Sequence, residues 1–346
     1  MKEKSALCGQ EPGKTSDIPA GRRDRVRYLI LLPVFWLVLL TGCGNTELPF
    51  PYDPDYEVSS FRVVRDAAGS VASSFAEDLC VTTTDVGVDT VPVDLTDVTA
   101  AGLFDLNRHE VLYAKNIHER LNPASLTKIM TALVALKHGN PDDMITVTDE
   151  ARITESGATL CGLKTGDTLT LNQALHALLI SSANDAAAAI AVHIAGSIEG
   201  FADMMNQEAL KIGATNSHFT NPHGLTAEDH YVTAYDLYLI FNEALKYELI
   251  SEIIHMTSYE TAYTDASGNS RALTCQNTNL FLRGDYKTPD QVNVIGGKTG
   301  TTTAARSCLI LLCRDASGNP YIAVMLSAKE RDLLYQTMSG LLNVIN

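Results

Sequence analysis

Short apolar runs bounded by polar turns occur in two separate parts of the chain. Gly102–Leu106 and Val111–Ala114 flank the polar stretch Asn107–Glu110, a pattern that predicts a β-hairpin. Three further apolar or β-branched runs come much later, and the last two are joined by a turn-forming Asp-Ala-Ser-Gly-Asn-Pro sequence. These later runs are Val292–Ile295, Leu309–Cys313 and Ile322–Leu326. The sequence therefore predicts strands towards both ends of one folded region.

Between these groups of strands the apolar positions follow a helical period. Leu126, Ile129, Met130 and Leu133 have the i, i+3, i+4, i+7 spacing of a buried stripe, and a proline just before them is tolerated in a first helical turn. Similar patterns predict helices over 171–180, 185–194 and 201–212, a fifth that begins at the capping sequence 233–236, and a last one over 333–345. The order of elements predicts an α/β fold with one antiparallel sheet that both ends of the region complete.

The amino terminus has a different pattern. Four arginines precede the apolar stretch Tyr28–Leu40, which is shorter than the roughly 20 residues of a transmembrane helix and has the make-up of a secretory signal. The small residues before Cys43 resemble the bacterial lipobox, and the resemblance implies cleavage before Cys43 and a lipid on its thiol. An uncleaved signal anchor is the alternative. We therefore expect an extracytoplasmic lipoprotein anchored to the cell membrane.

The segment after Cys43 is expected to be a tether. Three prolines between Gly44 and Tyr56 exclude a helix there. The following residues are rich in Ser, Thr, Asp and Val, with an edge strand expected around Leu79–Thr83. The predicted organisation is a signal peptide over 1–43, a linker over 44–98 and one folded domain over 99–346.

Composition and charge narrow the class of protein. The 346 residues are 45% hydrophobic and 19% charged, as in globular proteins generally. The formal net charge of −15 argues against nucleic acid as a partner, because nucleic-acid binding needs cationic surfaces. Five cysteines remain after Cys43, and their spacing fits no zinc site, so no cofactor is expected.

Three short motifs occur in order: Ser125-Leu126-Thr127-Lys128, Ser182-Ala183-Asn184 and Lys298-Thr299-Gly300. Each is weak alone, because further matches are present. Those further matches are Lys164-Thr165-Gly166, Ser267-Gly268-Asn269 and Ser317-Gly318-Asn319. Context separates them, since both extra S-x-N triplets lie in glycine-bearing turns and only the Lys298 motif follows an apolar strand. The ordered set is typical of penicillin-binding proteins and class A β-lactamases.

The first motif predicts a nucleophile and its base. Ser125 and Lys128 lie one helical turn apart on one face, so the amine can reach the hydroxyl. A serine hydroxyl needs a base, and a lysine can act as that base only if its pKa falls. Burial, a helix N-terminus and a second cation, Lys298, would each lower the pKa of Lys128.

The strand motif predicts how a substrate is held. The backbone N–H groups of Ser125 and Thr301 are the expected donors to a developing oxyanion. Gly300 is expected to let a substrate backbone lie along the strand edge, and Lys298 and Thr299 to bind a terminal carboxylate.

Four segments together resemble the D-alanyl-D-alanine carboxypeptidase family of low-molecular-weight penicillin-binding proteins. They are 122–131, 181–186, Asn221-Pro222-His223-Gly224-Leu225 and 296–302. The resemblance runs from about Ala101 to the end. It implies the serine β-lactamase/DD-peptidase sandwich, in which helices flank an antiparallel sheet and a helical subdomain is attached. It implies an acyl-enzyme at Ser125, a proton shuttle at Ser182, and Asn184 holding the substrate amide.

By the same resemblance, the substrates are peptidoglycan pentapeptide stems that lose their terminal D-alanine, and β-lactam antibiotics are covalent inhibitors. One departure concerns the arginine that the family carries near the start of its last helix, where this chain is read as having Leu334. We hypothesise that Arg306 takes over the binding of the terminal carboxylate, with Arg331 as the alternative and a plain surface role for Arg306 also open.

Other functions remain as alternatives. A β-lactamase of class A would need a glutamate in an E-x-x-x-N loop, and none occurs between Asn184 and Lys298, so penicillins are expected to acylate Ser125 and leave slowly. A transpeptidase, a serine glutaminase and an inactive penicillin-binding sensor share parts of the pattern. His218, His223 and His230 cluster locally without the ligand spacing of a metal hydrolase.

Overall fold

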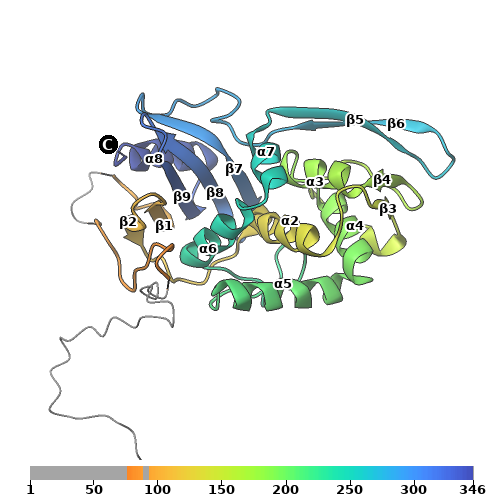
Figure 1. The fold of residues 1–346 in the computed structure, drawn as a ribbon, viewed down its shortest axis with the longest axis horizontal. Helices are drawn as coiled ribbons and strands as arrows, with labels where there is room; N and C mark the ends of the chain where they lie inside the picture. The colour runs from red at the N-terminus through yellow and green to blue at the C-terminus, as the bar shows by residue number, and fades with distance from the viewer. Residues whose placement is uncertain (1–75, 89–92, 346) are drawn as a thin grey trace, which may run out of the picture. The chain divides into compact units, whose positions relative to one another are not determined.

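The main sheet joins strands from the two ends of the domain. The computed structural model describes residues 76–88 and 93–345. Five antiparallel strands lie in the order β2-β1-β9-β8-β7 (Figure 1). Their bounds are Val98–Asp105 (β1), Glu110–Lys115 (β2), Val292–Thr302 (β7), Arg306–Asp315 (β8) and Pro320–Ala328 (β9). The predicted hairpin and the single sheet completed by both ends are confirmed.

Helices cover both faces of this sheet (Figure 1). The bounds are Thr127–His138 (α2), Leu171–Leu179 (α3), Asn184–Ala195 (α4), Ile198–Ile212 (α5), Ala234–Ala244 (α6), Glu248–His255 (α7) and Arg331–Leu342 (α8). Neighbouring strand residues alternate between two cores: Phe104 packs towards the helical block, and Leu103 packs towards α8. The α/β sandwich expected from the sequence is therefore the observed fold. All the predicted helices form, and the short α7 was missed.

A second sheet was not expected. It has the order β3-β4-β5-β6, with bounds Met144–Thr146 (β3), Thr168–Thr170 (β4), Ser258–Thr264 (β5) and Ser270–Gln276 (β6). β5 and β6 form a long hairpin (Figure 1). Every residue of β5 is exposed or half-buried, so this strand lacks the apolar run by which the other strands were recognised.

The start of the described chain packs against the domain. The backbone N–H of Cys80 donates to the Tyr238 hydroxyl at 2.9 Å, and the Tyr235 hydroxyl donates to the Cys80 carbonyl at 3.0 Å. The edge strand expected around Leu79–Thr83 does not form, because side chains of α6 take the backbone groups of this segment. Instead, a single bridge pairs Val86 with Ala114.

The remaining predictions about the amino terminus concern residues that the structure does not describe. Cys43, the signal peptide and the tether up to residue 75 lie outside the described residues. The division into 1–43, 44–98 and 99–346 therefore stays a prediction. Over 76–88 and 93–345, no helix is both long and apolar enough to span a bilayer.

Candidate active site

The predicted nucleophile lies in a tight turn that leads into α2. Ser125 is the middle residue of a 3-10 turn, Ala124–Leu126, and Lys128 is the second residue of α2. The helix therefore begins more tightly than predicted, and Lys128 Nζ still lies 2.8 Å from Ser125 Oγ. Ala124 has a φ of +47°, in the left-handed region that non-glycine residues rarely adopt. Strain of this kind persists only where neighbouring contacts hold it.

Three oxygen atoms surround the amine of Lys128, which is fully buried. Besides Ser125 Oγ, Nζ reaches Asn184 Oδ1 at 2.6 Å and the His223 carbonyl oxygen at 2.7 Å. Burial, and then the charge of Lys298, hold the pKa of Lys128 well below its usual value. An amide oxygen and a carbonyl oxygen can only accept, so a neutral amine gives its two protons to them and turns its lone pair towards the Ser125 hydroxyl.

The second motif lies between α3 and α4 and meets the third. Ser182 has a φ of +62°, and its Oγ accepts a hydrogen bond from Lys298 Nζ at 2.8 Å. Asn184 is the first residue of α4, and its backbone N–H donates to the Thr159 carbonyl at 2.8 Å. The two motifs, 116 residues apart in the chain, are thus joined by one hydrogen bond.

Lys298 lies on β7, at the edge of the main sheet. Its side chain is 1% exposed, and burial lowers its pKa to about 7. Nζ also donates to the Thr299 carbonyl at 2.9 Å. A cation that loses its proton near neutral pH can influence both Ser182 and Lys128.

A cavity brings the motifs together at its surface. Ser125, Ser182, Thr299, Gly300 and Thr301 line it, while Lys128 and Asn184 lie behind them. Arg331, named from the sequence as the alternative carboxylate-binding residue, also lines it. The remaining lining residues were not predicted: Thr159, Thr278, Leu280, Arg283, Ser307, Leu334 and Tyr335. Thr159 and Thr278 come from irregular loops, and no local pattern distinguishes them from other loop threonines.

Gly300 was expected to make room for a substrate backbone, but its nearest neighbours belong to the turn that carries Ser125. A Cβ atom at this position would lie 3.0 Å from both the Ser125 nitrogen and the Pro123 carbonyl oxygen. The absent side chain therefore leaves room for the nucleophile turn itself. This contact fixes how near β7 comes to Ser125.

The hypothesis that Arg306 faces the substrate is not supported by its position. Arg306 is the first residue of β8, has a φ of +58°, is exposed, and does not line the cavity. Arg331 does line it. α8 begins at Arg331, two residues before the predicted start of that helix. The chain therefore has an arginine at the start of its last helix, and the departure inferred from Leu334 came from placing that start too late. In the described part of the chain, no carboxylate pairs with Arg331.

Comparisons with known proteins agree with this geometry. The family model for D-alanyl-D-alanine carboxypeptidase matches residues 89–330. The chain belongs to this family. It is 37% identical to D-alanyl-D-alanine carboxypeptidase DacF of Bacillus subtilis over 62% of this chain, and 30% identical to DacA of Escherichia coli over 74%. The matched regions are 53% of DacF and 61% of DacA, so the chain spans little more than half the length of these relatives.

Two solved structures superpose on this fold over nearly their whole length. The DD-transpeptidase of Streptomyces K15 superposes with a TM-score of 0.66 at 26% identity, covering 72% of this chain and 96% of that one. The D-alanyl-D-alanine carboxypeptidase of Mycobacterium tuberculosis gives 0.65 at 26% identity, covering 74% and 94%. The family and fold expected from the four sequence segments are confirmed.

Proposed function

We propose that this protein is a serine-type D-alanyl-D-alanine carboxypeptidase that removes the terminal D-alanine from peptidoglycan pentapeptide stems. The observation that carries the proposal is the buried amine of Lys128, 2.8 Å from Ser125 Oγ, which borders a cavity. Membership of the family supports the same activity.

Acylation begins when Ser125 gives its proton to Lys128 and Oγ attacks the carbonyl carbon of the penultimate D-alanine. The carbonyl oxygen becomes an oxyanion that the N–H groups of Ser125 and Thr301 stabilise. The peptide bond then breaks, and the departing nitrogen takes a proton from Ser182. Ser182 recovers the proton that Lys128 took from Ser125, so the leaving amine departs with that proton, Lys128 is neutral again and Lys298 keeps its charge. Water later cleaves the Ser125 ester in the same way, releasing the shortened stem.

The terminal carboxylate of the substrate lies between Thr299 and Arg331 in this proposal. Arg331 supports it because it lines the cavity and pairs with no carboxylate of residues 76–88 and 93–345, and an arginine binds a carboxylate through two parallel hydrogen bonds. Lys298 attracts the carboxylate through its charge and does not contact it directly, since its Nζ is already bonded to Ser182. Asn184 keeps Lys128 oriented and holds the substrate amide.

A transpeptidase is the second candidate, and the likeness to the Streptomyces K15 DD-transpeptidase over 96% of its chain favours it. Both reactions share the acyl-enzyme and differ in whether water or an amine cleaves it. β-Lactam antibiotics form the same ester with Ser125 and leave slowly in this proposal.

The test is incubation with a pentapeptide that ends in D-Ala-D-Ala, with and without a stem peptide carrying a free amine. We expect release of free D-alanine and of a tetrapeptide. A Ser125→Ala variant should release none, and a pentapeptide ending in L-alanine should stay intact. A product joined to the added amine would indicate transpeptidation, and an unchanged pentapeptide would contradict both candidates.

We also propose that Cys43 carries a lipid that anchors the protein outside the cytoplasm. The support is the arginine-rich start, the short apolar stretch and the small residues before Cys43. A Cys43→Ser variant should accumulate as unprocessed precursor in place of the mature, membrane-bound protein. Labelled fatty acid should no longer be incorporated into it. Labelling that persists in this variant would contradict the proposal.

A further inference from the structure

The peptide bond between Ala124 and Ser125 has two functional ends. Its N–H belongs to Ser125 and has no acceptor among the described residues, so it is free to face an oxyanion. Its carbonyl oxygen belongs to Ala124. A trans peptide is planar with C=O and N–H pointing in opposite directions, so whatever holds the Ala124 oxygen also aims the Ser125 N–H.

Two donors of Thr127, in the first turn of α2, hold that oxygen. Its backbone N–H donates to the Ala124 carbonyl, and its side-chain Oγ1 donates to the same carbonyl at 2.9 Å. A threonine hydroxyl has one proton, so Thr127 Oγ1 can only accept from its other partner. That partner is His230 Nε2, at 2.8 Å.

The direction of this chain of hydrogen bonds follows from its far end. The backbone N–H of Thr220 donates to His230 Nδ1 at 3.1 Å, so Nδ1 is an acceptor and the proton of the neutral ring lies on Nε2. Three donors then point the same way: Thr220 N–H to the ring, the ring to Thr127, and Thr127 to the Ala124 carbonyl. Such chains polarise one another in a buried setting.

Burial keeps the chain in this state. Thr127 is fully buried and His230 is 2% exposed. Burial, with a smaller contribution from His218, lowers the pKa of His230 to about 4, so the ring is neutral at physiological pH. Gly224 packs directly against the Ala124 carbonyl, because any side chain at this position would collide with that oxygen.

We propose that His230 is a positioning residue that, through Thr127, turns the Ser125 N–H towards the cavity and so builds half of the oxyanion hole. This orientation requires the strained left-handed backbone of Ala124, and the hydrogen-bond chain holds Ala124 in that conformation. This inference rests on the proposed function, since it assigns a role in acylation of Ser125.

The test compares variants that keep or remove each hydrogen bond. Thr127→Val keeps the shape and loses the hydroxyl, while Thr127→Ser keeps it. His230→Leu loses the donor, while His230→Gln keeps an N–H near the position of Nε2. Each variant is measured for kcat and KM with the D-Ala-D-Ala pentapeptide, for its Tm, and for affinity towards a peptide boronic acid, which forms a tetrahedral adduct with the serine.

Loss of one oxyanion donor lowers kcat about 100- to 1,000-fold, and misdirection should cost roughly 10- to 100-fold. We expect Thr127→Val and His230→Leu to lose that much in kcat and in boronic acid affinity, with KM nearly unchanged, because the oxyanion exists only in the transition state. The Ser and Gln variants should stay within about threefold of wild type by the same reasoning. The double variant Thr127→Val/His230→Leu should be no slower than Thr127→Val, since both act through one chain.

Several outcomes would overturn the inference. Wild-type kcat in a folded Thr127→Val variant would do so, as would losses confined to KM or to Tm. If His230→Leu does not fold, the Thr127 pair and His230→Gln still decide the question. A wild-type enzyme that releases no D-alanine would instead remove the proposed function, whereas an active wild type with an equally active Thr127→Val variant would remove only this inference.

Discussion

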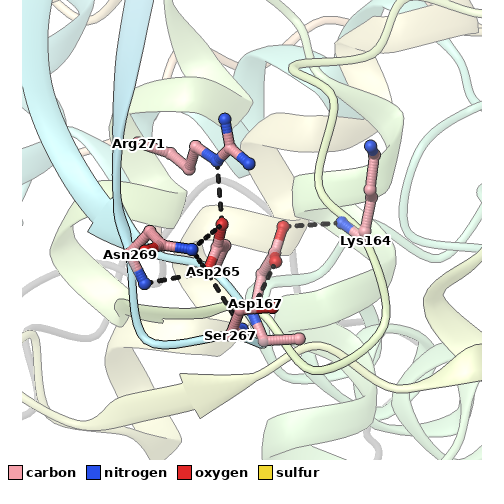
Figure 2. Close-up of polar contacts among 7 residues, drawn as sticks. Lys164, Asp167, Asp265, Ser267, Asn269 and Arg271 are labelled. Carbon is pink, nitrogen blue, oxygen red and sulfur yellow. Dashed lines mark hydrogen bonds and ion pairs between the residues drawn. The ribbon is translucent and has the colours of Figure 1, made fainter.

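The chain contains the sequence Lys-Thr-Gly twice, and the two copies occupy opposite environments. Lys164-Thr165-Gly166 lies in an exposed turn beside the β5–β6 hairpin, as Figure 2 shows for Lys164. The backbone N–H of Lys164 donates to Asp167 Oδ2 at 2.9 Å, and its carbonyl accepts from the Asp167 N–H at 3.0 Å. Among the described residues, its amine makes no hydrogen bond or ion pair. The other Asp167 oxygen accepts from the backbone N–H of Ala266 at 3.2 Å, which ties this turn to the tip of the hairpin.

The second copy lies within β7. Lys298 is buried there, its pKa falls to about 7, and it donates to Ser182. The glycines also differ: Gly166 has a φ of +89° that a turn requires, whereas Gly300 leaves room for the Ser125 nitrogen. The same three letters therefore serve a turn in one place and chemistry in the other, because burial and neighbours decide what an amine does.

The largest expected effect comes from replacing Lys298, with the same replacement at Lys164 as the control. Lys298→Ala should lower kcat/KM for the pentapeptide by about 100- to 1,000-fold, because Ser182 loses its donor and the carboxylate site loses its charge. Lys164→Ala should stay within about twofold, since exposed lysines without partners contribute little. D-alanine release measures both, and equal losses in the two variants would break the contrast.

Arg331 and Arg306 allow the same comparison, since one lines the cavity and the other does not. Arg331→Ala should raise KM about 10- to 100-fold, as expected when a substrate carboxylate loses a charge-assisted pair. Arg306→Ala should leave KM unchanged, because its side chain is outside the cavity. Steady-state kinetics with the pentapeptide decide between them, and the reverse result would restore Arg306 as the carboxylate-binding residue.

The glycines should separate activity from stability. Gly300→Ala places a methyl group 3.0 Å from the Ser125 nitrogen, so acylation should slow by about tenfold with little change in Tm. Gly166→Ala must hold a φ of +89° with its Cβ 2.7 Å from Ala266 Cβ, so it should lose about 1–2 kcal/mol of unfolding free energy at unchanged kcat. Penicillin acylation rates and urea unfolding report the two quantities. A slower Gly166→Ala enzyme would contradict the separation.

The last prediction concerns the pH profile of kcat/KM, whose limbs the two lysines should set. Lys128 must be neutral to take a proton, so kcat/KM should fall on the acid side, where it becomes charged. Lys298 must be charged, so kcat/KM should also fall by about tenfold per pH unit above its pKa of about 7. Lys298→Arg should shift the alkaline limb upward, because a guanidinium keeps its proton. Lys164→Arg is the matched control and should leave the profile unchanged. An alkaline limb that stays in place in Lys298→Arg would assign it to another group.

Patterns that local physics makes explicit were predicted well. The buried strands β8 and β9 are continuous apolar runs, and the helix α2 has a clear buried stripe. β5 was missed because it exposes most of its side chains, and α7 because eight residues give too little periodicity. The cavity residues Thr159 and Thr278 were missed because loops carry no period at all.

The sequence alone determined the order of the main-sheet strands and of every helix but α7, the family, and the three motifs that hold Ser125, Lys128, Ser182, Asn184 and Lys298. These follow from the spacing of apolar and motif residues along the chain, which can be read from the sequence without knowing the fold. Only the tertiary structure decided which Lys-Thr-Gly is buried, that Arg331 faces the cavity and Arg306 does not, and that His230 reaches Ala124 through Thr127. Burial, pKa and hydrogen-bond direction depend on residues distant in the chain, so they exist only once those residues have been brought together.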